Sequence, residues 1–234
     1  MKKKHLVIIP GWGGSHETWQ DFVEIAQTEF DVMVIDLPCF GSEPCPSTVW
    51  GVVEYAEFVK SRIENIQCDL LLGHSFGGQI AAYLVLKNPN VCTKLILSGA
   101  AIYRPKKWVR RGIFFIIAKF GKVIFRFPHI EKFDAWARKV LYRVADSPDY
   151  SETVEIKRDI FKKIIREDIS GSLSSLKKET LVIWGEKDSY VPLRFGKKIA
   201  KEIKDSKMEI IQDGKHGLHI QKSKELLEII KNFS

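Results

Sequence analysis

The sequence predicts an α/β fold, in which a mostly parallel β-sheet carries helices on both faces. Short apolar runs alternate along the 234-residue chain with longer stretches whose apolar residues recur at helical spacing. The short runs are apolar throughout, which is typical of strands buried on both faces of a parallel sheet. The strand candidates are residues 6–9, 32–35, 70–72, 95–97, 181–184 and 208–211. Helical spacing marks residues 18–28, 52–66, 77–87 and 223–233.

Residues 103–170 interrupt this alternation with helical stretches that are rich in aromatic and basic side chains. These stretches are residues 108–120, 132–143 and 152–166. The segment contains no convincing buried strand, and it lies between two strand candidates. We therefore expect a core domain of residues 1–102 and 171–234 with a helical cap, or lid, of residues 103–170. Such a cap would lie over the carboxyl edge of the sheet, where open α/β sheets hold their sites.

The net charge of +8 is concentrated in this predicted cap. Residues 103–170 hold 17 Lys and Arg against 9 Asp and Glu, and the rest of the chain holds 20 of each kind. A basic cap can dock an acidic acyl-carrier protein or a phosphate-bearing ligand, although a solvated charged face has the same composition. Residues 113–120 are apolar and basic enough for a membrane-surface helix, or they line an acyl pocket. No nucleic-acid recognition motif accompanies the charge.

Composition and cysteine usage predict a cytoplasmic protein without a membrane anchor. The mean hydropathy is −0.11, and no apolar run approaches the length of about 18 residues that a spanning helix needs. The basic start at residues 1–4 precedes an apolar run too short for a signal peptide. The cysteines show no metal-ligand spacing, so we expect reduced thiols and no metal site. They are Cys39, Cys45, Cys68 and Cys92.

Residues 73–77 read Gly-His-Ser-Phe-Gly, which is the G-x-S-x-G pattern between a buried strand and a helix. A sharp turn from strand to helix exposes the serine hydroxyl above the sheet, and the flanking glycines remove Cβ atoms that would collide. The helix N-terminus also favours developing negative charge. We predict Ser75 as a catalytic nucleophile. The alternative is a serine that caps the following helix.

Residues 73–78 resemble the nucleophile elbow of the α/β-hydrolase family, and the resemblance extends over nearly the whole chain. It is weakest in residues 103–170. The family order is serine, then an acid, then histidine. The resemblance therefore implies that the other members of the triad lie towards the C-terminus.

The acid and the base follow two later strand candidates. Asp188 lies in the loop after residues 181–184 and is our choice for the triad acid, with Glu186 as the alternative. His216 lies between the last strand and the closing helix and is our choice for the base. His219, three residues further on, is the alternative.

The oxyanion hole is expected to use two backbone N–H groups, those of Trp12 and Phe76. Phe76 follows the nucleophile, and Trp12 lies in a glycine-rich loop that resembles the family's His-Gly-x-Gly loop. Pro10 stands where a histidine is usual in that loop. Residues 34–42 resemble a structural motif of the family, with Cys39 where glycine is common, and we expect Cys39 to be a packed thiol.

The resemblance implies a serine hydrolase that cleaves a carboxylic ester through an acyl-enzyme intermediate, with no metal or organic cofactor. The opening loop and the compact layout are similar to the pimeloyl-carrier-protein methyl ester esterases. The chain also resembles lactonases and C–C bond hydrolases, which are the alternative activities. A further alternative is a catalytically silent, ligand-binding member of the fold.

Overall fold

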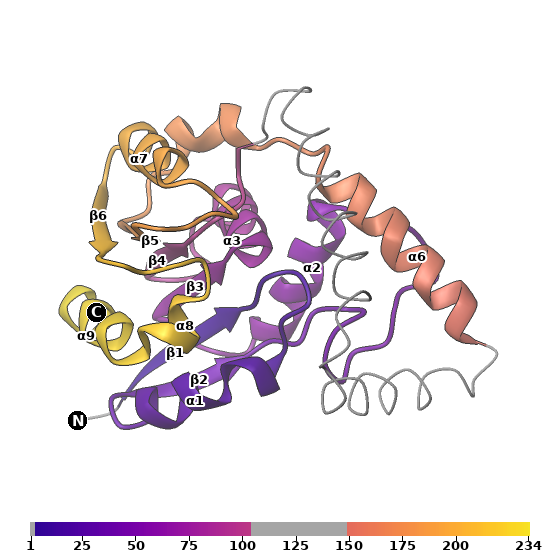
Figure 1. Cartoon of the computed structure of the whole chain (residues 1–234), viewed down its shortest axis with the longest axis horizontal. Coiled ribbons are helices and arrows are strands. Elements are labelled where there is room, and N and C mark those ends of the chain that lie inside the picture. Colours follow the sequence, from indigo (N-terminus) through magenta and orange to yellow (C-terminus); the bar gives the residue numbers. More distant parts are fainter. Residues whose placement is uncertain (1–2, 104–148) are drawn as a thin grey trace, which may run out of the picture.

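A computed structural model of the chain describes residues 3–103 and 149–234, and its centre is a six-stranded parallel sheet of order β2-β1-β3-β4-β5-β6 (Figure 1). The strands are β1 Lys4–Ile9, β2 Phe30–Val34, β3 Leu70–His74, β4 Lys94–Ser98, β5 Thr180–Gly185 and β6 Ser206–Ile211. Every strand predicted from the sequence is confirmed. The chain runs outward from β1 to β2 and then crosses back to β3. The strand order therefore reverses between β1 and β3, and the carboxyl ends of these strands are where such a fold places its site.

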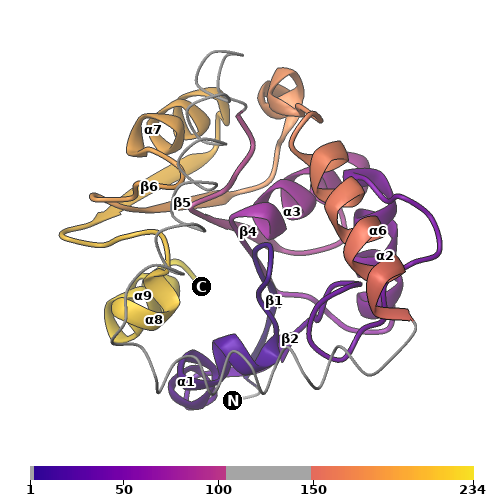
Figure 2. The same cartoon turned by 45° about the vertical axis from the view of Figure 1, so that its right-hand side comes forward.

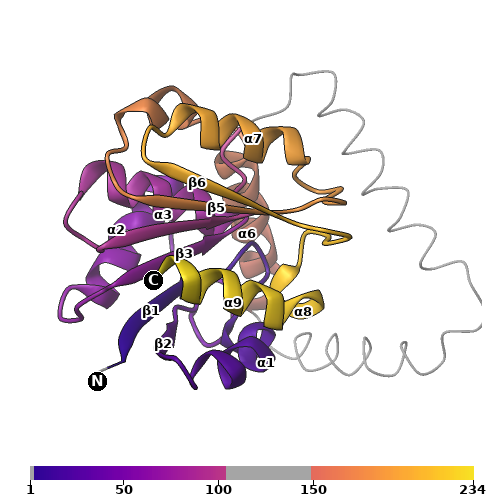
Figure 3. The ribbon, with the colours of Figure 1, turned by 90° about the vertical axis from the view of Figure 1, so that its left-hand side faces the viewer.

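Helices cover both faces of the sheet (Figure 2). One layer contains α1 His16–Ala26, α8 Leu218–Gln221 and α9 Ser223–Phe233. The other layer contains α2 Val52–Ile63, α3 Phe76–Lys87, α6 Asp149–Ile164, the 3-10 turn η1 Ser170–Ser175 and α7 Leu193–Glu202. Figure 3 shows α7 and α9 on opposite sides of β5 and β6. The helices predicted at α1, α2, α3 and α9 are confirmed, whereas α7 was not predicted.

The strands alternate their side chains between two apolar clusters, one under each helix layer. Val7 and Ile9 of β1 pack beneath α2 and α3, while Leu6 and Ile8 pack against α1 and α9. All four side chains are fully buried. Burying a side chain of this size contributes about 1.5–3 kcal/mol, so a one-residue slip in register, which exchanges the two faces, is strongly disfavoured.

The described part of the predicted cap is helical. Helix α6 overlaps the predicted stretch 152–166 and packs its buried Ile160 and Ile164 into the same apolar cluster as α2. The stretches 108–120 and 132–143, and with them the candidate membrane-surface helix, lie outside the described residues. Across residues 3–103 and 149–234, no helix has the length and apolar character needed to cross a bilayer.

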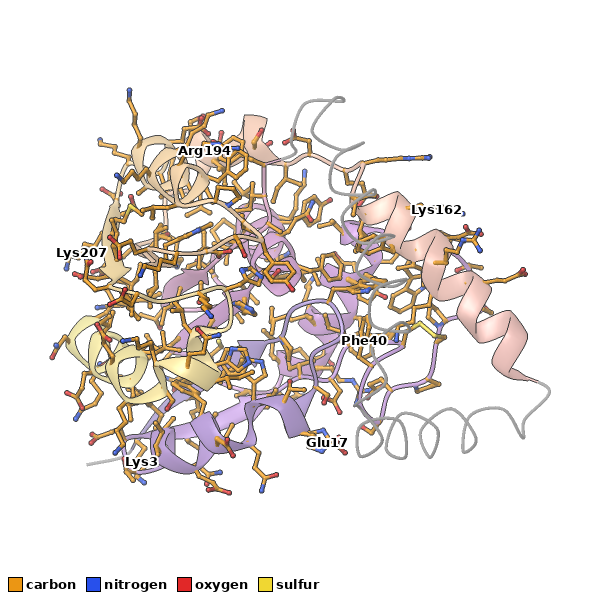
Figure 4. All side chains as sticks on the ribbon, viewed as in Figure 1. Lys3, Glu17, Phe40, Lys162, Arg194 and Lys207 are labelled. Carbon is orange, nitrogen blue, oxygen red and sulfur yellow. A yellow bond between two sulfur atoms is a disulfide. The ribbon has the colours of Figure 1, made fainter. Side chains whose placement is uncertain are left out.

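Two of the cysteines form a disulfide, so the expectation of reduced thiols is wrong for Cys39 and Cys45. Figure 4 shows this bond in yellow beside Phe40. Cys39 is therefore not the packed thiol that the sequence suggested. Cys68 and Cys92 are free and buried. Burial raises the pKa of both free thiols, which keeps them protonated and unreactive.

Candidate active site

The turn from β3 into α3 is a sharp elbow with Ser75 at its tip. Ser75 has φ +53° and ψ −115°, a conformation outside the regions that L-residues favour. Gly77 permits the elbow, because a Cβ there would lie 2.1 Å from the carbonyl oxygen of Ile9. Gly73 is equally constrained, since its Cβ would lie 2.5 Å from the carbonyl oxygen of Gly77. The serine is therefore held in a strained position by close backbone packing of β1 against α3.

The side chain of Ser75 does not cap the helix that follows it. Ser75 is the N-cap residue of α3, yet its hydroxyl makes no capping hydrogen bond. The capping interpretation raised from the sequence would require such a bond. Backbone bonds hold the residue instead: its N–H donates to the carbonyl of Ser98 at 3.0 Å, and its carbonyl accepts from Ala101 N–H at 2.9 Å.

Asp188 and His216 are joined by a hydrogen bond. Nδ1 of His216 donates to Oδ2 of Asp188 at 2.7 Å, although these residues follow different strands. The other oxygen of Asp188, Oδ1, accepts from the backbone N–H groups of Tyr190 and Val191 at 2.9 and 2.8 Å. The Asp188 side chain is 1% exposed. A buried carboxylate with these donors is rigid, so it fixes the tautomer and the orientation of the imidazole.

The alternative acid and base make other contacts. Glu186 is exposed and accepts from the backbone N–H of Asp213 at 3.2 Å. His219 is buried and stacks on Trp19, with ring centroids 3.9 Å apart and planes 6° apart. Its Nδ1 atom has no hydrogen-bond partner within the described part of the chain. The structure therefore pairs Asp188 with His216 and does not pair Glu186 with His219.

The turn after β4 brings the elbow and the imidazole to the same edge of the sheet. The carbonyl of Ser98 accepts from Ser75 N–H, and the neighbouring Gly99 lies against His216. A Cβ on Gly99 would be 3.2 Å from Nδ1 of His216. The ring of His74, next to the serine, lies 4.8 Å from the His216 ring, centroid to centroid. Ser75, His216 and Asp188 are thus gathered at the carboxyl ends of β3, β4 and β5.

Two neutral imidazoles lie near His216. Burial lowers the pKa of His74 well below its usual value, and the neighbouring His216 and His219 lower it further. Burial, and to a smaller extent His216, lowers the pKa of His219 to about 4. Both rings are therefore uncharged at neutral pH, and neither adds a fixed positive charge beside His216.

The glycine-rich loop after β1 lies against Ser75. A Cβ on Gly11 would be 3.0 Å from the Cβ of Ser75, and the next residue is Trp12. The Trp12 ring packs edge-on against Phe40, with centroids 4.8 Å apart, and lies 5.0 Å from the ring of Phe161 on α6. Phe76 is the first residue of α3, and the first N–H groups of a helix have no partner within it. The two predicted oxyanion donors thus belong to segments that meet at Ser75.

Asp36 ties the end of this loop to the segment that carries Phe40. Its carboxylate accepts from the backbone N–H and from Nδ1 of His16, both at 2.6 Å, and from the N–H and hydroxyl of Ser42. Burial raises the pKa of Asp36, but the hydrogen bonds from Ser42 and His16 outweigh burial and lower it overall. The hydrogen bond to Asp36 raises the pKa of His16.

The His16–Asp36 pair is expected to stabilise the fold most in mildly acidic solution. His16 contributes fully below its unfolded pKa of 6.5 and loses that contribution as the pH rises through its higher folded pKa. Asp36 contributes above 3.8 and loses its contribution as the pH falls through its lower folded pKa. The difference in Tm between wild type and His16→Gln should therefore be largest near about pH 5 and smaller at about pH 9. Equal differences at both pH values would contradict this account.

Sequence reasoning missed several residues that line the site. His74 was given no role and His219 was weighed only as an alternative base, because nothing in a single sequence reveals that the ring of His74 lies beside those of His216 and His219. Phe40 and Phe161 lie far from the motifs in sequence, and only the fold brings them to Trp12. Cys39 did carry a signal: it stands at a position where glycine is common, and it has φ +76°.

The chain belongs to the α/β-hydrolase family, since the family model described as the alpha/beta hydrolase fold matches residues 4–223. The resemblance noted in the sequence is thereby confirmed, and the fold and family support hydrolase activity.

Named relatives and solved structures are similar to the chain over almost its whole length. It is 24% identical to the uncharacterized hydrolase YugF of Bacillus subtilis, over 99% of this chain and 90% of YugF. It is 26% identical to a pimeloyl-[acyl-carrier protein] methyl ester esterase of Aeromonas hydrophila, over 97% of this chain and 94% of that esterase. The structure of the meta-cleavage product hydrolase CumD of Pseudomonas fluorescens has a TM-score of 0.75 at 17% identity, over 99% of this chain and 90% of CumD.

Proposed function

We propose that the protein is a serine hydrolase that cleaves carboxylic esters, with Ser75 as nucleophile, His216 as general base and Asp188 as the orienting acid. The observation that carries this proposal is the Asp188–His216 hydrogen bond of 2.7 Å beside a strained serine. Burial supports the proposal, because the carboxylate is 1% exposed whereas the imidazole is 17% exposed and open to solvent or substrate.

The proposed reaction is acyl transfer to water. His216 Nε2 takes the hydroxyl proton as Ser75 Oγ attacks the carbonyl carbon, and Asp188 stabilises the imidazolium that forms. The N–H groups of Trp12 and Phe76 donate to the oxyanion. His216 then protonates the leaving alkoxide, which departs as the alcohol and leaves an acyl-enzyme. Water attacks the acyl carbon with His216 again as base, and the carboxylic acid and free Ser75 are released. These steps require no metal and no organic cofactor.

A carboxylic ester is the proposed substrate class. The named esterase relatives act on a methyl ester, and the partly buried rings of Trp12 and Phe161 offer an apolar surface beside the proposed oxyanion hole. The likeness to CumD shows the fold alone and does not identify a substrate. Lactones and C–C bonds are the alternative substrates for Ser75, His216 and Asp188.

The test is turnover of p-nitrophenyl esters of graded acyl length, together with labelling by a fluorophosphonate. We expect turnover, a length profile that sizes the acyl site, and a single label on Ser75 found by peptide mass spectrometry. Labelling without ester turnover would direct the search to lactones and C–C substrates. A folded protein with neither labelling nor turnover would be a ligand-binding member of the family.

We also propose that residues 103–170 form a cap on a core of residues 1–102 and 171–234. Helix α6 supports this division, because its Phe161 ring lies 5.0 Å from Trp12 at the site. The excess of basic residues in this segment favours docking of an acidic acyl-carrier protein. The esterase relatives are named for a substrate linked to such a carrier.

Carrier docking predicts a salt effect that depends on the substrate. Raising the ionic strength should raise KM for an ester linked to an acyl-carrier protein and leave KM for a small neutral ester unchanged. Steady-state kinetics on both substrates measure this. An equal response of the two substrates would remove the carrier from the proposal. The cytoplasmic location stays a prediction. The expectation of reduced cysteines no longer supports it, because Cys39 and Cys45 form a disulfide.

A further inference from the structure

The Cys39–Cys45 disulfide closes a short loop directly after β2. The bonded residues are six apart in sequence, and both are half-buried. Two hydrogen bonds flank Phe40 in this segment: the Tyr55 hydroxyl donates to the carbonyl of Pro38 at 3.1 Å, and the Ser42 N–H donates to Asp36 at 3.0 Å. Phe40 lies within this loop directly after Cys39, so the disulfide adds a covalent constraint beside it.

Phe40 connects this loop to the proposed oxyanion hole. Its ring lies 4.8 Å from the ring of Trp12, centroid to centroid and edge to face. The residue as a whole is 5% exposed. Lys157 of α6 also packs on this ring, with Nζ 4.3 Å from the Phe40 centroid, and donates to the carbonyl of Cys39 at 3.1 Å. Phe40 thus contacts both Trp12 and Lys157, and it follows the disulfide-bonded Cys39 in the chain.

The backbone of Cys39 favours movement once the cross-link is broken. Cys39 has φ +76°, in the left-handed region that residues with a Cβ seldom occupy. The Cys39 N–H donates to the carbonyl of Pro44 at 3.2 Å, and the disulfide closes the same loop covalently. With free thiols, relaxation of Cys39 would shift Phe40, its neighbour in the chain, away from Trp12.

We infer that the Cys39–Cys45 disulfide is a positioning element of the oxyanion hole, which holds Trp12 through Phe40 and makes hydrolysis depend on the redox state of this pair. The inference rests on the proposed function, since Trp12 matters there as an oxyanion donor. Cys39 and Cys45 would act through Phe40 and do not touch the substrate.

The redox step is a thiol–disulfide exchange with a dithiol reductant. One thiolate of the dithiol attacks a sulfur of the pair, the Cys39–Cys45 bond breaks, and a mixed disulfide forms. The second thiol of the reductant attacks the mixed disulfide, so the reductant leaves as a cyclic disulfide. Two electrons and two protons pass to the protein, and Cys39 and Cys45 become thiols. Half-burial leaves the pair within reach of a small dithiol such as dithiothreitol.

The experiment compares the oxidised protein with the protein reduced by dithiothreitol, using one p-nitrophenyl ester. We expect kcat to fall about 10-fold on reduction with little change in KM, because a displaced donor weakens transition-state binding selectively. Alkylation and mass spectrometry establish the redox state, with two further modified cysteines after reduction. Cys39→Ser/Cys45→Ser should show the low kcat and no response to dithiothreitol. Cys68→Ala/Cys92→Ala, which keeps the disulfide, is the matched control and should respond as wild type does.

A second readout separates this inference from the proposed function. Acrylamide quenching of tryptophan fluorescence, in wild type minus Trp12→Phe, reports the exposure of Trp12 and needs no activity. We expect the Trp12 contribution to be quenched more strongly after reduction. Unchanged quenching with proven reduction would overturn the inference, as would a kcat that stays within about two-fold in active enzyme. Four alkylated cysteines in protein treated with an oxidant would also overturn it. If the protein turns over no ester but the quenching of Trp12 still increases on reduction, the proposed function is refuted. The link between the disulfide and Trp12 is then retained.

Discussion

Replacement of Ser75 by alanine is expected to lower kcat for ester hydrolysis by at least about 10,000-fold, since removal of a triad nucleophile abolishes the covalent route. The loss should fall on kcat and leave KM almost unchanged, because the hydroxyl contributes mainly to the transition state. Stability should change little, as the Ser75 hydroxyl makes no capping bond and an alanine at this position would keep the same backbone contacts. Steady-state kinetics and a thermal melt measure both quantities.

Ser61→Ala is the matched control for this variant. Ser61 lies in α2, and its hydroxyl donates to the carbonyl of Phe58 at 2.8 Å, away from the site. Its kcat should equal that of wild type. Full activity in a verified Ser75→Ala protein would exclude Ser75 as the nucleophile, and with it the proposed mechanism.

Replacement of Asp188 by asparagine is expected to lower kcat by about 10,000-fold. The amide keeps the shape of the side chain but removes the negative charge that stabilises the imidazolium of His216. It also presents an N–H₂ group, which favours the wrong tautomer of the ring. Because the carboxylate is 1% exposed and accepts three hydrogen bonds, solvent cannot supply a substitute charge.

Glu186→Gln tests the competing assignment of the acid. Glu186 is exposed and bonds to the backbone of Asp213, so its variant should keep kcat within about two-fold of wild type, as surface changes usually do. A large loss in Glu186→Gln with an active Asp188→Asn would reverse the two roles. Kinetics of both variants on the same ester decide between them.

The fold was predictable from the sequence where burial dictates composition. The run at residues 70–72 is apolar because β3 is buried on both faces at the centre of the sheet. A buried strand can therefore be predicted from these residues alone. The elbow was predictable for a related reason, since the close approach of Gly77 to β1 admits only glycine. Strict steric requirements of this kind leave a local trace in the sequence.

Other features have no such trace. Helix α7 has four basic side chains among its ten residues and buries only Gly196 and Ile199, so its apolar signal is weak. The stacking of His219 on Trp19 joins residues from α8 and α1. These residues are far apart in the sequence, so no local pattern predicts their contact. The disulfide was missed because the spacing of the cysteines led to the expectation of reduced thiols. The pairing of Cys39 with Cys45 depends instead on the shape of the loop between them.

The pairing of β4 with β5 has a consequence for how this protein can change over evolutionary time. β4 ends at Ser98 and β5 begins at Thr180, so the core closes across a long intervening segment. Closure entropy rises only logarithmically with loop length, by about 0.6 kcal/mol for each doubling. Outside the residues that pack into the core, such as Ile160 and Ile164 of α6, changes in the length of this segment therefore cost little folding stability. Changes of length there can therefore alter specificity while the six-stranded sheet is kept.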